Sequence, residues 1–335
     1  MVSRVFLICR LALVLFPVAL PAETVLSLIG GRNAGEHNLE AGSRMPGLLS
    51  EDGRGRGSRI SYRRDFSYGG LSLTHSAGAW RAGLAFTATG WYVDSGGTRD
   101  EDFYMTIASG LREGGYNPFT NEFSDSAHIY TGTANFADAR ARSTITDYAI
   151  DLPLRYYLWP RLSDTNRVSG FFLAGGLRYN YFKLFVYDVI QFVDREPIFL
   201  GPIGEGLTFS NSVLEARGGL GYAHGFGGGW ELDGALYSLS GSNRARDHHI
   251  QRGLNFIIFE SYGSGFLANL GLSYSFTGGL RLQAQVYAHR YYSRGLMRTT
   301  GGYTDTDILS TFSGPFTVWV GTKEAGGSLS LAYGF

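Results

Sequence analysis

Two short stretches, far apart in the chain, contain residue types suited to activating a water molecule. In an extended strand, side chains at positions i and i+2 point to the same face. Asp247 therefore shares a face with His249, and Asp100 shares a face with Asp102. A histidine accepts a proton best when a carboxylate holds its other nitrogen, and two facing carboxylates tend to share a proton and hold a water. If the fold joins the two pairs, they form a hydrolytic site.

Each pair alone is a weak signal, because acidic residues in loops are usually only solvated. The elements that position the pairs therefore decide the interpretation. Aromatic residues make up 15% of the chain, and its 335 residues include 48 glycines but only 9 prolines, which favours β-structure over helix. Lys and Arg total 29 and Asp and Glu total 29, so the formal net charge is zero. That balance argues against a nucleic-acid-binding protein, which would show a basic excess.

Residues 1–22 are predicted to be a signal peptide. Arg4 precedes an apolar run from Val5 to Leu20, and Pro21-Ala22 then provides a small residue for cleavage. A membrane anchor is the other interpretation, but the run is short. The single cysteine, Cys9, would leave with the signal, which excludes disulfides, thiolate metal sites and cysteine nucleophiles from the exported domain, residues 23–335.

Beyond residue 22 no apolar stretch reaches the roughly 18 residues that a spanning helix needs. Strict alternation occurs instead, as in 80–89, 147–158 and 280–289, with apolar residues on one face and polar or charged residues on the other. A soluble sandwich would hide the apolar faces in a core, but export and the many charged faces favour a barrel with a wet lumen. The predicted strands are 24–40, 58–74, 80–95, 143–159, 167–190, 206–224, 230–243, 252–276, 280–295 and 318–335.

The connections between these strands fall into two classes that alternate along the chain. Short turns contrast with long polar loops, which is the pattern of outer-membrane barrels. The predicted long loops are 41–57, 96–142, 191–205, 244–251 and 296–317. We therefore predict an all-β fold, a ten-stranded antiparallel transmembrane β-barrel in a bacterial outer membrane, with long extracellular loops and short periplasmic turns. Both acidic pairs then lie on its outer rim.

The residues around both pairs resemble those of one known family. The segment from Trp91 to Phe103 looks like the region of the omptin family of outer-membrane proteases that carries their catalytic Asp-x-Asp. The segment from Tyr237 to His249 resembles the strand and loop with their Asp-x-His dyad, and the end of the chain, Leu331–Phe335, is also similar. The strand count and the order of long and short connections agree along essentially the whole exported chain.

The resemblance implies an aspartic-type endopeptidase whose active site faces the exterior. Asp247 would orient His249, and His249 would deprotonate a water lying between this dyad and the Asp100/Asp102 couple. The water would attack the peptide carbonyl without a covalent enzyme intermediate. Glu36 would correspond to a family acidic residue that binds a basic P1 side chain.

The resemblance also implies the partners of the protein. These are protein or peptide substrates at the cell surface and lipopolysaccharide, which omptins generally need for activity. Arg59, Arg63 and Arg64 are the candidates to meet the phosphates of that lipid. No cofactor or metal is implied, no group of His, Asp and Glu has convincing metal spacing, and we expect a monomer.

The chain departs from the omptin pattern at two positions. Phe103 stands where the family usually has Trp, a mild change. Ala245 stands where omptins that cleave next to basic residues have an acidic residue, and Arg244 and Arg246 flank it. Like charge repels a basic substrate, so a neutral or acidic P1 residue, or loss of activity, stays open.

Two other functions compete with the protease. A non-catalytic barrel could serve as an adhesin or binding surface through its long outer loops, and it would cut nothing. A diffusion pore would conduct in planar bilayers, although charged residues facing each other across a ten-strand lumen would fill it. The geometry separates these hypotheses, because in a protease the two pairs must face each other across the rim and not point to lipid.

Overall fold

The computed structural model describes residues 22–42, 57–106, 115–117, 122–124, 134–162, 168–193, 196–200, 204–303, 308, 311–312 and 314–335. The predicted signal peptide therefore lies outside the described residues, apart from Ala22. Within the described part, no helix is long and apolar enough to cross a membrane.

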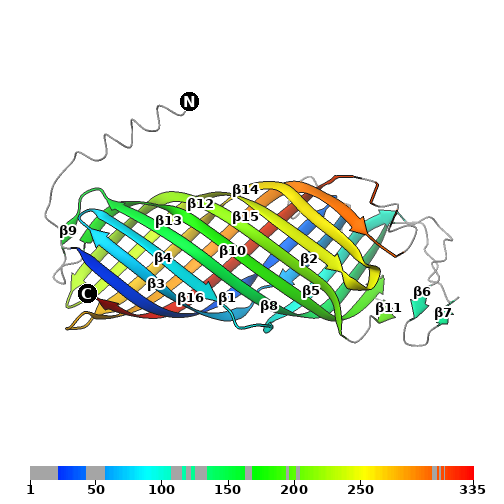
Figure 1. Cartoon of the computed structure of the whole chain (residues 1–335), viewed down its shortest axis with the longest axis horizontal. Coiled ribbons are helices and arrows are strands. Elements are labelled where there is room, and N and C mark those ends of the chain that lie inside the picture. Colours follow the sequence, from blue (N-terminus) through cyan, green and yellow to red (C-terminus); the bar gives the residue numbers. More distant parts are fainter. Residues whose placement is uncertain are drawn as a thin grey trace, which may run out of the picture.

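The strands close into one antiparallel barrel with ten strand positions (Figure 1). β1 pairs with β16 and closes the ring, and two of the ten positions consist of two consecutive strands. β2 and β3 are separated at Arg64-Asp65, and β4 and β5 are separated at residues 89–92. Around the ring the order is β1, β2 with β3, β5 with β4, β8, β10, β12, β13, β14, β15 and β16.

Each of the ten predicted spans coincides with a strand position, but 58–74 and 80–95 are each interrupted, and several strands extend beyond the predicted bounds. The strands are β1 (Glu23–Ala41), β2 (Gly57–Arg63), β3 (Phe66–Ala77), β4 (Trp80–Ala88), β5 (Val93–Thr106), β6 (Gly115–Asn117), β7 (Glu122–Ser124), β8 (Ala134–Tyr157), β9 (Arg161–Leu162), β10 (Val168–Val193), β11 (Glu196–Leu200), β12 (Glu205–Gly227), β13 (Trp230–His249), β14 (Leu254–Ser275), β15 (Leu280–Gly301) and β16 (Phe316–Gly334), and a short 3-10 helix, η1 (Ile250–Arg252), follows β13.

Short and long connections lie at opposite ends of the barrel, as predicted. The turns at 78–79, 228–229 and 276–279 share one end with the last residue, Phe335, while β6, β7 and β11 lie at the other end (Figure 1). The predicted loops are too long, because strands continue into them: residues 96–106 belong to β5, 134–142 to β8, 191–193 to β10 and 296–301 to β15. Residues 244–249 continue β13, and only η1 and Gly253 separate it from β14.

The apolar faces of the strands lie on the outer surface of the barrel and not in a core. The residues that alternate outward on the half nearest the short turns are large and apolar, and aromatic side chains line the end of that half. Because about 9–11 residues of a strand cross a bilayer, β8 with 24 residues and β10 with 26 extend well beyond it. Examples of this outward apolar set are Leu28, Leu71, Leu84, Leu152, Leu220, Leu236, Leu270, Val286 and Leu331, with Trp80, Phe226, Trp230 and Phe335 at the rim.

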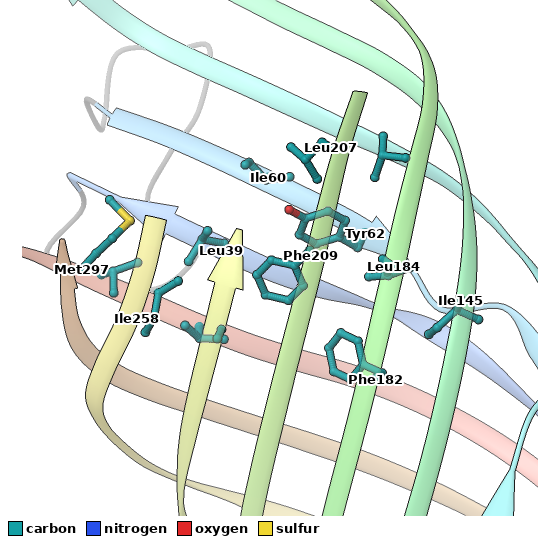
Figure 2. Close-up of a cluster of buried hydrophobic side chains, with 14 of the residues drawn as sticks. Leu39, Ile60, Tyr62, Ile145, Phe182, Leu184, Leu207, Phe209, Ile258 and Met297 are labelled. Carbon is teal, nitrogen blue, oxygen red and sulfur yellow. The ribbon is translucent and has the colours of Figure 1, made fainter. Parts of the chain in front are cut away.

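The interior is filled by side chains at two levels. An upper cluster of buried apolar residues, near the long connections, surrounds Tyr62 and Phe209 (Figure 2). A lower cluster surrounds Tyr157, Phe172 and Tyr237. Buried ion pairs accompany both clusters, so the lumen combines apolar packing with paired charges.

Candidate active site

The Asp247/His249 pair lies on the inner face at the end of β13. Along this strand the burial alternates, with Glu231, Asp233 and the other odd-numbered residues inward. The alternation continues to the last residues, so Asp247 is 1% exposed and both members of the pair face the interior and not lipid. His249 Nε2 lies 3.1 Å from Asp247 Oδ2. With Nε2 carrying the proton, Nδ1 of His249 is the nitrogen that can accept one.

Asp100 reaches the same region from the other wall of the barrel. It lies on β5, opposite Ile60 of β2, and Ser58 Oγ is 3.4 Å from Asp100 Oδ1. The connection across the lumen is aromatic. The ring of Tyr62 on β2 stacks on the ring of Phe209 with centroids 4.6 Å apart, and Phe209 is the cross-strand partner of Asp247. The two walls that carry the predicted pairs therefore meet in the interior.

The other predicted site residues are placed differently. The backbone of Asp102 pairs with Ser58 and Ala137, but its side chain lies outside the described residues. Glu36 faces outward on β1, accepts a hydrogen bond from Asn38 and is not brought to the dyad. Glu36 was matched to a family residue that binds the substrate, but on β1 the neighbouring His37 is the residue that faces inward, at 0% exposure.

The surroundings of Ala245 also differ from the prediction. Ala245 faces inward and packs in the upper apolar cluster. Arg244 and Arg246 are exposed on the opposite face, where Arg246 Nε donates to Asn255 Oδ1 at 2.9 Å. The two arginines therefore add no positive charge to the interior beside Ala245. At the position where some omptins have an acidic residue, this chain therefore has part of the upper apolar cluster.

Arg64 was predicted at the lipid headgroups, but it lies in the interior at 2% exposure. Even-numbered residues face inward in both β2 and β3, on either side of Arg64, and its Nη2 lies 2.7 Å from Asp147 Oδ2 and 3.6 Å from Glu324 Oε2. His289 joins the same cluster through Glu324, at 3.3 Å, and also pairs with Glu215 at 3.0 Å. Arg59 and Arg63 do lie on the outside, paired with Glu40 and Asp65.

Electrostatics favour the charged form of His249. Burial opposes that form, but the carboxylates of Asp247 and Asp100 outweigh it, so the pKa of His249 lies above its usual 6.5. His37 shows the opposite behaviour, because burial and the nearby Arg64 lower its pKa to about 3. A neutral histidine and a readily protonated one thus share the upper interior.

We expect Asp100→Asn to lower the pKa of His249, because the substitution removes a negative charge that stabilises the imidazolium. NMR titration of the His249 ring in the refolded barrel measures this. The wild-type midpoint should lie above pH 6.5 and the variant midpoint below that of the wild type. An unchanged midpoint would mean that Asp100 does not act on the dyad.

Sequence reasoning missed one residue of this region, Tyr62. Its side chain is fully buried, and its hydroxyl has no hydrogen-bond partner among the described residues. The alternation of Ile60 and Tyr62 with Ser61 and Arg63 could have indicated that it faces inward. In the same described part, no group of three or more His, Cys, Asp and Glu side chains could hold a metal ion.

Comparison with known proteins places the barrel in a family. A family model with the description "Putative porin" matches residues 49–328. The chain belongs to this family. A search of curated proteins gave no match.

Among solved structures, the outer membrane protease OmpT from Escherichia coli has a similar fold. Its TM-score is 0.64 at 12% identity, and the match covers 93% of this chain and 97% of OmpT. The outer membrane protein OprG from Pseudomonas aeruginosa matches with a TM-score of 0.36 and 9% identity, over 95% and 97% of the two chains. The family match and the fold shared with OmpT confirm the predicted outer-membrane β-barrel, and the likeness to an omptin is one of fold alone.

Proposed function

We propose that this barrel is an omptin-like endopeptidase whose active site opens at the cell exterior. The observation that carries the proposal is the Asp247–His249 pair, 3.1 Å apart on the inner face, with the charge of Asp100 on β5 close enough to act on His249. The matching fold of OmpT, a protease by its name, adds support.

The proposed reaction uses water as the nucleophile. His249 takes a proton from a water held between the dyad and the Asp100/Asp102 couple, and the water oxygen attacks the carbonyl carbon of the peptide. The tetrahedral intermediate then collapses, and His249 returns the proton to the leaving amine. Asp247 orients the imidazole and stabilises its charged form. Because the base must be neutral, cleavage should increase as the pH passes the raised pKa of His249.

Ala245 and the apolar cluster around it bear on specificity. With no carboxylate at that position and with Glu36 on the outer face, the described interior beside the dyad offers little to a basic P1 side chain. We therefore expect cleavage next to neutral residues. The test of the proposal is cleavage of peptides by refolded protein with lipopolysaccharide, compared with Asp247→Asn.

The outer face of β15 supports lipopolysaccharide as the partner lipid. Arg290, Arg294 and Arg298 are exposed above the apolar residue Val286, on the same face of the strand. Each lies over an aromatic ring at 4.9–5.7 Å, and none forms an ion pair with a carboxylate in the described part of the chain. Unpaired arginines directly above an apolar band suit lipid phosphates.

Replacing the three arginines with glutamine should weaken lipopolysaccharide binding. At about 1 kcal/mol for each charge near an anionic surface, the loss is on the order of 100-fold in affinity. Binding of the refolded barrel to lipopolysaccharide aggregates measures this, with Arg161→Gln at the short-turn end as the control. Equal binding by the triple variant and the control would reject this surface.

A pore is the second candidate function, and the family description favours it. Two cavities of about 180 Å³ and about 240 Å³ occupy the interior and share several lining residues, among them Asp151 and Arg217. The upper apolar cluster and the Arg64 ion pairs stand in the way of a continuous path. Conductance of the purified barrel in planar bilayers would favour the pore over the protease.

A further inference from the structure

Tyr62 lies at the centre of the upper cluster, next to both acidic walls. Its ring stacks on Phe209 and lies 6.5 Å from the ring of His37. Figure 2 shows its hydroxyl directed toward Ile60 and Leu207. Ile60 is the cross-strand partner of Asp100, and Leu207 is the cross-strand partner of His249. The hydroxyl of Tyr62 therefore points to the height in the barrel at which Asp100 and His249 lie.

The upper cluster contains a buried hydrogen-bond donor and a buried acceptor that suit each other. Asp247 uses Oδ2 to hold His249, while its Oδ1 is buried without a partner among the residues that the structure describes. Among those same residues, the buried hydroxyl of Tyr62 also has no partner. Burying either group unpaired is costly, and one water is enough to join two such groups. Negative charge from Asp247 and Asp100 acts on Tyr62, which places all three groups in one electrostatic environment.

We propose that Tyr62 is a positioning residue of this site, and that its hydroxyl donates a hydrogen bond through one water to Oδ1 of Asp247. This bond fixes the carboxylate that holds His249, so Tyr62 acts on the reaction through Asp247 and does not touch the substrate. The inference deepens the proposed function and rests on it for its catalytic consequence. Its geometric part concerns only Tyr62, Asp247 and His249.

The phenol is suited to this role because it stays protonated. Burial, then the charges of Asp247 and Asp100, raise the pKa of Tyr62 well above its usual 10, so the hydroxyl remains a donor at all physiological pH values. A donor to a carboxylate disperses its negative charge and weakens its attraction for an adjacent imidazolium. Other groups act on His249 as well, and they stay constant when Tyr62 is changed. The charged and titratable groups around the dyad are Asp100 on β5, Arg252 on η1, His248 on β13 and His37 on β1.

The test is Tyr62→Phe, which keeps the stacked ring and removes only the donor. We expect the pKa of His249 to rise by about one unit, because a hydrogen bond to a charged group is lost. NMR titration of the His249 ring, assigned with His249→Gln, measures the shift without any substrate. In the cleavage assay we expect kcat to fall roughly tenfold with KM little changed.

Tyr291→Phe is the matched control. Tyr291 is also buried, at 2% exposure, and its hydroxyl also has no partner in the described part of the chain, but it packs in the lower cluster. This control should leave both the pKa of His249 and the rate unchanged. A folded Tyr62→Phe barrel with the wild-type pKa of His249 would overturn the proposal. A shifted pKa in a barrel that cuts no peptide would uphold the role of Tyr62 and reject the protease.

A second variant covers the case in which Tyr62→Phe does not fold. Replacing Tyr62 alone with 3-fluorotyrosine retains the hydroxyl and makes it a stronger donor. The pKa of His249 should then shift downward, opposite to the change expected for Phe. A pKa of His249 that is unchanged or higher with 3-fluorotyrosine at position 62 would overturn the proposal.

Discussion

Asp247→Asn is expected to lower kcat/KM for peptide cleavage by about 10³- to 10⁴-fold. The amide has nearly the volume of the carboxylate, so packing at this 1% exposed position should survive. The uncharged asparagine amide, however, cannot stabilise an imidazolium. Its NH₂ group can also donate to Nε2 of His249, which leaves the proton on Nδ1, so that Nδ1 no longer accepts a proton from the water. The expected loss therefore lies in the chemical step, with KM changed little.

His248→Gln is the control for this loss. His248 follows Asp247 directly but alternates to the other side of β13, where its backbone pairs with Thr208 and Asn255. A change there should leave cleavage within about twofold of wild type, as surface substitutions away from a site usually do. If His248→Gln and Asp247→Asn lost activity equally, the dyad would not be the source of catalysis.

Arg64→Met is expected to lower the free energy of unfolding by about 3–5 kcal/mol. Arg64 is 2% exposed, pairs with Asp147 and Glu324, and lies over the ring of Phe182 at 4.2 Å. Methionine fills much of the space but leaves two buried carboxylates without their shared cation. Urea unfolding in detergent micelles, followed by tryptophan fluorescence, measures the change.

Arg63→Met is the neighbouring control for the stability prediction. Arg63 also pairs with an aspartate, Asp65, but on the outer surface with its side chain 58% exposed. Such a pair contributes about 0–1 kcal/mol, so this variant should unfold almost as the wild type does. Similar losses in both variants would show that burial does not decide the value of these pairs.

The architecture was largely accessible from the sequence because a barrel strand repeats every two residues. Alternation placed all ten strands, and apolar residues such as Leu84 and Leu236 do face outward. At residues 244–249 the charged side chains favour a loop over a strand, and the prediction of a loop there is wrong. Period two in fact continues there, with Arg244 and Arg246 outward and Ala245 and Asp247 inward.

Two predictions failed on the face of the strand that a residue occupies. Even-numbered residues face inward in both β2 and β3, so period two itself places Arg64 inside the barrel despite its charge. On β1, Glu36 lies on the outward face and the neighbouring His37 lies on the inward face. The meeting of Tyr62 and Phe209 joins strands on opposite walls, and no local pattern specifies which side chains touch across a lumen.

The most direct test of the central claim is peptide cleavage by the refolded barrel. Wild type and Asp247→Asn, each with lipopolysaccharide, would be offered a diverse peptide mixture, and new termini would be read by mass spectrometry. We expect new termini with the wild type, next to neutral P1 residues, and their absence with Asp247→Asn. No new termini from a correctly folded wild-type barrel, or the same termini from both proteins, would contradict an Asp247/His249 protease.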